Sequence, residues 1–207
     1  MKADSGFVKI TSQPQKQLDA AADKVREAKE DITACKKAAL AHELRPLPGD
    51  TPQNAIQRLT SSIRKVSTCT DQLVNSVAIS DEEGATSSAQ GMSSGLADLA
   101  SAGRAVASIT GQPMQVITAT EEVLERSWTL LRESSTLIIS RESREYRERN
   151  LHPLARGVHE ALDRVRDSIP GQKDVDSAIQ SITNASQNIE HGKSVNAFNG
   201  FAGKNYG

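Results

Sequence analysis

Two stretches of the chain, 14-PQKQLDAAADKVREAKEDI-32 and 170-PGQKDVDSAIQSI-182, show the same pattern of polar and apolar residues. At a shift of 157 positions Gln172 and Lys173 fall on Gln15 and Lys16. At the same shift the apolar residues fall on apolar residues, namely Val175, Ile182 and Ile189 on Leu18, Val25 and Ile32. Apolar residues seven positions apart lie on one face of an α-helix. One helix face therefore occurs twice, which predicts a repeated helical architecture.

The composition supports a protein made of packed helices. The 207 residues are 37% hydrophobic and only 3% aromatic, so the core must consist of aliphatic side chains. Helix-forming residues fill the long stretches between a few clusters of Gly and Pro, which is typical of an all-α fold. The 25 basic and 26 acidic residues nearly cancel, so no overall field draws the chain to nucleic acid or to an anionic membrane.

Six segments carry apolar residues at the three- and four-residue spacing of amphipathic helices. They cover about 14–43, 52–77, 80–109, 113–138, 150–169 and 172–190. Thr51 before Pro52 predicts an N-cap followed by proline in the first helical turn, and Pro113 predicts another helix start. The spacing of Ser80 and Glu83 predicts a capping box. The charged run 140-SRESREYRERN-150 is interpreted as a solvated helix end.

Small and hydroxylated residues interrupt the apolar stripes. Gly91, Gly95 and Gly103 are expected to let a neighbouring helix approach closely, because they have no side chains. Their spacing does not fit a phosphate-binding loop. Thr70, Ser127 and Ser134 fall in or beside apolar stripes. A hydroxyl there contributes less burial than a methyl group, so we expect a softened core.

Five helices make one period of the repeat. The first and the sixth predicted helices are therefore equivalent elements of successive units. The joint between the last two helices is only Pro-Gly-Gln, whereas linker-like composition begins directly after residue 191. We therefore predict an antiparallel five-helix up-and-down bundle over 46–191. Residues 14–43 become an extra N-terminal helix that closes a preceding bundle, and 192–207 become a linker or disordered tail.

No arrangement of residues predicts catalysis. The histidines, His42, His152, His159 and His191, lack the spacing of a metal site, and no nucleotide-binding motif occurs. Cys35 and Cys69 are expected to be small core residues in a reducing cytosol. No apolar run approaches the roughly 20 residues that span a bilayer. We expect a non-enzymatic protein without metal or cofactor.

Particular phrases resemble the rod of talin, a cytoskeletal adaptor that joins integrins to actin. They are 44-LRPLPGDTPQ-53, 95-GLADLASAGRAVAS-108, 154-LARGVHEALDRV-165 and 170-PGQKDVDSAIQSITNAS-186, and the resemblance covers about 18–190. It implies tandem helical bundles that carry tension, and cryptic helices that bind vinculin once a bundle opens. It also implies a cytoplasmic location at the cytoskeleton and cell-matrix adhesions. The implied partners are actin filaments through the wider central rod, integrin through other parts of a longer chain, and neighbouring rod bundles. Neither nucleic acid binding nor direct membrane insertion is implied.

Vinculin-binding helices of this family follow a pattern such as L-x-x-A-A-x-x-V-A-x-x-V-x-x-L-I. The segment from Pro113 matches it with Val116, Ala119, Val123, Leu124, Leu130 and Leu131 as the candidate face. Thr120, Leu124 and Ser127 depart from the pattern. The segment from Leu154 to Ile169 also approximates it. Any amphipathic helix of a bundle approximates this pattern, so plain core packing is the alternative for both segments and the stronger one for the second. A lipid-exchanging bundle is a further alternative, but faces dominated by Ala, Ser and Thr are unlike its large apolar and basic residues.

Overall fold

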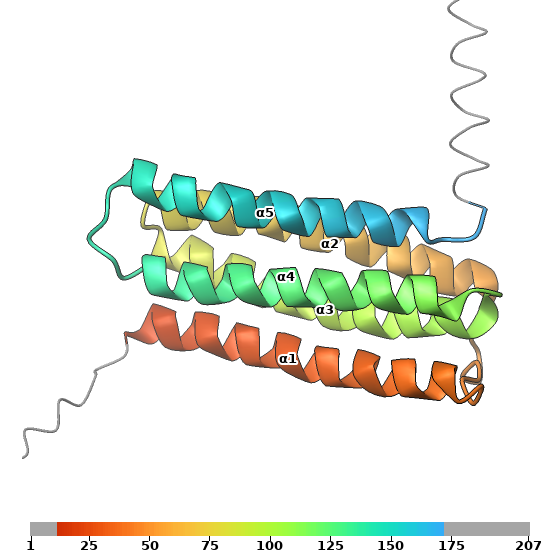
Figure 1. The fold of residues 1–207 in the computed structure, drawn as a ribbon. Coiled ribbons are helices and arrows are strands. Elements are labelled where there is room, and N and C mark those ends of the chain that lie inside the picture. The colour runs from red at the N-terminus through yellow and green to blue at the C-terminus, as the bar shows by residue number, and fades with distance from the viewer. Residues whose placement is uncertain (1–11, 172–207) are drawn as a thin grey trace, which may run out of the picture. The chain divides into compact units, whose positions relative to one another are not determined.

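The computed structural model describes residues 12–171, which form five α-helices joined by loops (Figure 1). The helices are α1 (Gln13–Leu40), α2 (Pro52–Ala78), α3 (Glu82–Ile109), α4 (Pro113–Leu137) and α5 (Arg144–Asp167). No strand occurs among these residues, so the all-α prediction is confirmed. The helix predicted over 172–190 and the tail over 192–207 lie outside the described residues.

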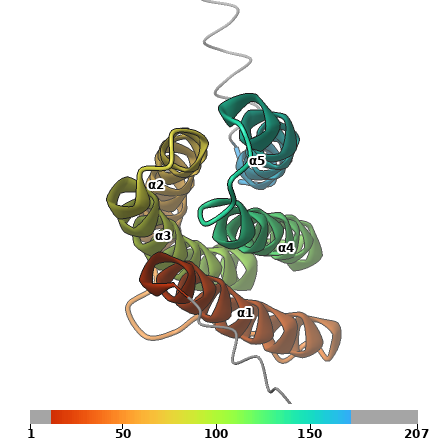
Figure 2. The same ribbon diagram turned by 90° about the vertical axis from the view of Figure 1, so that its left-hand side faces the viewer.

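Four of the helices form a closed ring, and the fifth lies against one side of it. In the ring α2 packs on α3, α3 on α4, α4 on α5, and α5 again on α2, as the view along the bundle shows (Figure 2). Helix α1 packs on α3 and α4. Consecutive helices run antiparallel, so α1 begins at the end of the bundle opposite to that where α5 finishes (Figure 1).

Two of the predicted helix starts are confirmed, and a third lies one residue later than predicted. The Thr51 hydroxyl accepts a hydrogen bond from the Asn54 amide at 3.2 Å, and Pro52 follows it in the first turn. Pro113 begins α4. The cap of α3 is Asp81 rather than Ser80, because the Asp81 carboxylate accepts from the Gly84 amide at 3.0 Å.

The predicted start of the last described helix is wrong by about one and a half turns. Helix α5 begins at Arg144, not near Asn150, because the Ser143 hydroxyl accepts a hydrogen bond from the Tyr146 amide at 3.2 Å. Pro153 therefore lies inside the helix and not in its first turn. The charged run belongs mainly to the start of α5, and one of its arginines, Arg147, is buried.

The core is aliphatic, as the composition predicts. Its largest fully buried side chains come from all five helices: Leu18, Ile32, Leu59, Leu73, Met92, Leu96, Leu99, Ile117, Leu124, Leu130, Leu131 and Leu151. Glycines of α3 allow close helix packing. A Cβ atom on Gly91 would lie 2.9 Å from the Cys69 sulfur, and one on Gly103 would lie 2.7 Å from the Thr120 hydroxyl. The predicted role of these glycines in tight packing is confirmed.

The structure differs from the assignment of residues 14–43 to a preceding bundle. Leu18, Val25 and Ile32 of α1 are at most 1% exposed and belong to the same hydrophobic cluster as the ring. Periodicity identified the apolar face of this helix but could not say which neighbours cover it. Whether 46–191 folds without α1 stays a prediction.

We predict that Gly103→Ala destabilises the bundle. Thr120 is fully buried and bonded to the Val116 carbonyl at 2.8 Å, so it cannot easily move from an added methyl group. Overpacking costs about 1–3 kcal/mol, against a gain of about 1 kcal/mol in helix propensity. Thermal denaturation should give a lower Tm. Gly111→Ala is the matched control, since nothing lies within 4 Å of its added Cβ, and an equal effect of both changes would contradict the packing argument.

We also expect a chain beginning at residue 46 to melt at a lower temperature than residues 12–171. Removing α1 exposes the faces of α3 and α4 that Leu18, Val25 and Ile32 cover. Burial of each such side chain contributes about 1.5–3 kcal/mol, so the Tm should fall by roughly 10 °C or more. A cooperative transition of 46–191 at an unchanged Tm would instead support the boundary predicted from the sequence.

Candidate functional site

The candidate face on α4 is buried inside the bundle. Five of its residues are at most 1% exposed and Ala119 is 8% exposed; the five are Val116, Val123, Leu124, Leu130 and Leu131. The face is therefore a shared part of the core and not an open surface. A partner could contact these side chains only after α4 separates from its neighbours.

Helix α4 has the most central position among the described helices. It contacts each of the other four, most extensively α1, α5 and α3. Helices α1 and α5, by contrast, do not pack against each other. Any mechanical connection between α1 and α5 within the described bundle must therefore pass through α4 or through the other ring helices.

Three ion pairs connect α1 and α4 along their antiparallel interface. The Arg132 guanidinium lies 2.8 Å from the Asp19 carboxylate, and the Lys36 ammonium lies 2.7 Å from the Glu121 carboxylate. Lys29 pairs with Glu125 between them. These side chains are one quarter to one half exposed, so each pair contributes only about 0–1 kcal/mol. The ion pairs align α4, whereas burial of its apolar face supplies most of the stability.

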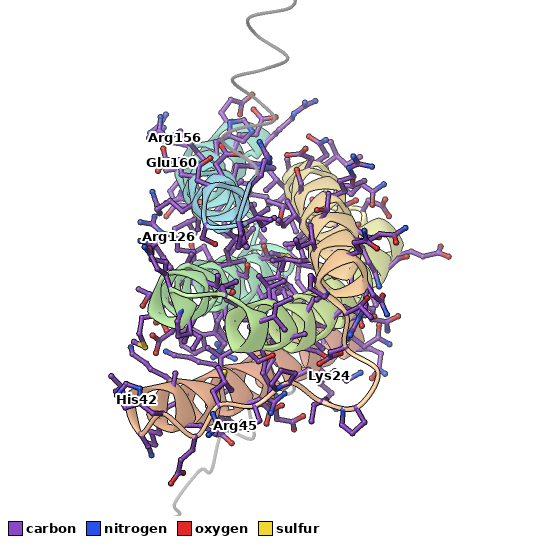
Figure 3. All side chains as sticks on the ribbon, turned by 90° about the vertical axis from the view of Figure 1, so that its right-hand side faces the viewer. Lys24, His42, Arg45, Arg126, Arg156 and Glu160 are labelled. Atoms are coloured by element: carbon purple, nitrogen blue, oxygen red, sulfur yellow. The ribbon has the colours of Figure 1, made fainter. Side chains whose placement is uncertain are left out.

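A fourth polar connection joins α4 to α5. The Arg164 guanidinium donates two hydrogen bonds to the Glu122 carboxylate, at 2.8 and 2.7 Å, and Arg126 donates a third at 3.0 Å. Hydrogen bonding from Arg164 holds the pKa of the Glu122 carboxyl below its ordinary value. The contribution of this group to stability is thus present above its ordinary pKa and is lost as the pH falls through the lowered value. Figure 3 shows Arg126 on the same side of the bundle as Arg156 and Glu160.

Two hydroxyl groups on α4 are buried without a hydrogen-bond partner. Ser127 and Ser134 are fully buried, and neither side-chain oxygen has a partner. Thr70 is also fully buried, but its hydroxyl donates to the Val66 carbonyl at 2.8 Å. All three residues, which fall in or beside the apolar stripes of the sequence, are thus buried. Their spacing in the sequence could not reveal which of them lack a partner, because that depends on neighbouring helices.

The alternative face on α5 is buried to a similar degree. Val158, Ala161, Leu162 and Val165 are at most 1% exposed, whereas Leu154 is only partly buried. This face packs against α2 and α4. Burial therefore does not separate the two candidate helices. Their positions do, because α4 contacts four helices and α5 contacts two.

The described residues offer little for metal binding or catalysis. No group of three His, Cys, Asp or Glu side chains in residues 12–171 is arranged to hold a metal ion. His159 bonds to Asp71 at 2.8 Å and to Ser67 at 3.3 Å, which links α5 to α2. Burial raises the pKa of the Cys35 and Cys69 thiols, which disfavours their reactive thiolate form. None of the described helices has a hydrophobic stretch that would carry it through a bilayer.

Comparison with known proteins gives consistent matches. The sequence profile of the family described as "Talin IBS2B domain" matches residues 13–172, which include all five described helices. Talin-2 of Homo sapiens is 31% identical over 176 residues, talin of Oscarella pearsei 29% over 180, and talin-1 of Gallus gallus 28% over 179. The alignments cover 84%, 86% and 84% of this chain, respectively. The chain spans about 7% of the length of each of these relatives.

We predict that Ser127→Ala stabilises the bundle. The change removes a buried hydroxyl without a partner and improves helix propensity, and together these effects should be worth about 1–2 kcal/mol. For a domain of this size the Tm rises by roughly 2–4 °C per kcal/mol. The exposed Ser87 of α3 is the matched control, because Ser87→Ala changes propensity alone. A Tm that rises no more for Ser127→Ala than for Ser87→Ala would contradict this account.

Proposed function

Because the chain belongs to the talin family, with the described bundle as a Talin IBS2B domain of the rod, we propose that it serves as a tension-bearing segment of a cytoskeletal adaptor. In this proposal the wider protein links integrin adhesions to actin filaments on the cytoplasmic side of the membrane. The bundle stands in series with neighbouring rod bundles. Its own contribution is mechanical and not enzymatic.

The arrangement of the helices supports a load path through α4. Helix α1 begins and α5 finishes at opposite ends of the bundle, so tension applied there pulls the two helices in opposite directions along their axes (Figure 1). Since α1 and α5 do not touch, the shear passes through α4, which contacts both of them, and through the longer route by way of α3 and α2. The interfaces of α4 with α1 and α5 carry the polar pairs Asp19–Arg132 and Glu122–Arg164.

We further propose that the face of α4 binds vinculin when the bundle opens. The observation that carries this proposal is the complete burial of Val123, Leu124 and Leu131 on the helix with the most neighbours. An amphipathic helix can exchange an intramolecular core for a hydrophobic groove on a partner, because both bury the same apolar stripe. The closed bundle must then bind weakly, since only the small open population is competent.

Two other interpretations make different demands. A purely structural spacer needs the same core but no partner for α4. A lipid-exchanging bundle would bind vesicles while intact. On the buried side of α4, Thr120 and Ser127 carry uncharged hydroxyl groups. Helices that bind lipid carry large apolar and basic residues instead, so these hydroxyls argue against the lipid-exchanging bundle.

We expect the vinculin head to bind a peptide of residues 113–138 at least tenfold more tightly than it binds the intact bundle. Isothermal titration of both molecules would measure this difference. Ser127→Ala should weaken binding to the intact bundle by roughly tenfold per 1.4 kcal/mol of added stability, because opening becomes rarer.

The same substitution in the peptide serves as the control, since the peptide has no bundle to open and its affinity should change little. Equal affinities of bundle and peptide would remove the requirement for opening. Absence of binding by both would leave the spacer as the function of this bundle.

A further inference from the structure

Ser80 is an exposed residue of the α2–α3 connection whose hydroxyl does not cap α3. Asp81 makes the capping contact instead, so the Ser80 side chain is available for another one. Its backbone lies in the left-handed region, with a φ of 59°, and the Asp81 amide beside it donates to the Ser76 carbonyl at 2.8 Å. In this conformation the Ser80 hydroxyl accepts a hydrogen bond from Arg147 of α5.

Three acidic residues follow this serine. The sequence 80-SDEE-83 has a carboxylate at each of the three positions after Ser80, and no other Ser or Thr of the chain is followed by three acidic residues. Glu82 and Glu83 are exposed in the first turn of α3. Because helix ends fray, a small local opening presents all four residues in an extended form. A protein kinase that selects acidic residues after its target serine can therefore bind this segment.

The arginine that contacts Ser80 carries a buried charge. Arg147 is only 7% exposed, and its guanidinium donates to three uncharged acceptors: the Ala78 carbonyl at 3.4 Å, the Ser80 hydroxyl, and the Ser140 carbonyl at 2.8 Å. Its Nε is buried without a partner. None of the ion pairs within residues 12–171 includes this arginine. A buried cation without a counter-ion is costly, so a negative group attached at Ser80 would be stabilised by it.

We propose that Ser80 is a phosphorylation site for an acid-directed protein kinase, and that the phosphate pairs with Arg147. The kinase transfers the γ-phosphoryl group of ATP: a bond forms between the Ser80 oxygen and the γ-phosphorus, and the bond from this phosphorus to the β–γ bridging oxygen breaks. ADP leaves, and the hydroxyl proton passes to the catalytic base of the kinase. The new group carries a charge of about −1.5 to −2 at neutral pH and three acceptor oxygens.

The phosphate has two opposing electrostatic effects. The carboxylates of Asp81, Glu82 and Glu83 repel it, but these side chains are exposed, so water and salt screen the repulsion. Arg147 is buried and already donates to the Ser80 oxygen, so its attraction is screened much less. The N-terminus of α3 also favours a negative charge beside it. Phosphorylation should therefore strengthen the contact of α5 with the α2–α3 connection and stabilise the bundle.

Treatment of the full 207-residue chain with an acid-directed serine kinase and ATP tests the site. Mass spectrometry should find the phosphate on Ser80. The double change Glu82→Gln with Glu83→Gln should reduce the initial rate roughly tenfold or more, because the kinase loses the carboxylates that it selects. Ser87→Ala is the matched control, since this exposed serine of α3 has no acidic residue at the next three positions, and the rate should not change. Absence of phosphate from Ser80, with a kinase that modifies a generic acidic serine peptide, overturns the proposal.

Thermal denaturation tests the pairing with Arg147. The Tm of the phosphorylated chain should be roughly 2–4 °C higher than that of the unmodified chain. In Arg147→Gln, phosphorylation should instead lower the Tm, because only the repulsion from the three carboxylates remains. A Tm of the unsubstituted chain that does not rise on phosphorylation overturns the pairing.

Phosphorus NMR gives a second measurement that needs no substitution and so does not depend on whether Arg147→Gln folds. The second pKa of the phosphate should be lower in the folded chain than in the same phosphorylated chain unfolded in urea, because the guanidinium favours the dianion. The neighbouring carboxylates alone would raise this pKa, so the direction of the change separates the two effects. A pKa in the folded chain that is equal to or above the pKa in urea overturns the proposal.

Discussion

Burial of the apolar stripe of α4 is the constraint on which the rest of the bundle depends. This stripe is covered from several sides, by α1, α3 and α5, and each of these helices orients its own apolar face toward it. The ring of α2 to α5 closes around it, and α1 completes its cover. The helix that holds the bundle together is thus also the one whose face stays hidden while the bundle is closed.

The interior combines close approach with local weakness. Gly103 allows α3 to approach the Thr120 side chain, which shortens the distance between helices and increases dispersion contacts. Ser127 and Ser134, in contrast, bury hydroxyl groups that have no partner. Such groups reduce the stability of the closed state without changing its geometry. Helix α4 therefore packs tightly against its neighbours, while its closed state is less stable than a fully apolar interface would make it. This combination suits a bundle that opens under load.

The polar contacts at one end of the bundle differ from those along its sides. Along the sides, ion pairs such as Asp19–Arg132 join exposed positions of neighbouring helices. At the end where α1 begins, Arg147 is buried and donates to the Ala78 carbonyl at the end of α2 and to the Ser140 carbonyl of the α4–α5 connection. Desolvating a guanidinium is costly unless it is hydrogen-bonded, so this contact fixes the connections relative to each other.

The sequence by itself determined the helices and their apolar faces, because the spacing of residues such as Val116, Val123 and Leu130 is a local property of a helix. It also determined the family, through phrases such as 95-GLADLASAGRAVAS-108. Only the tertiary structure decided which faces meet. It placed α1 in the core with α3 and α4, buried Arg147 within a charged run, and left the Ser127 hydroxyl without a partner. These outcomes depend on contacts between residues far apart in the chain, and the periodicity of a single helix carries no information about its neighbours.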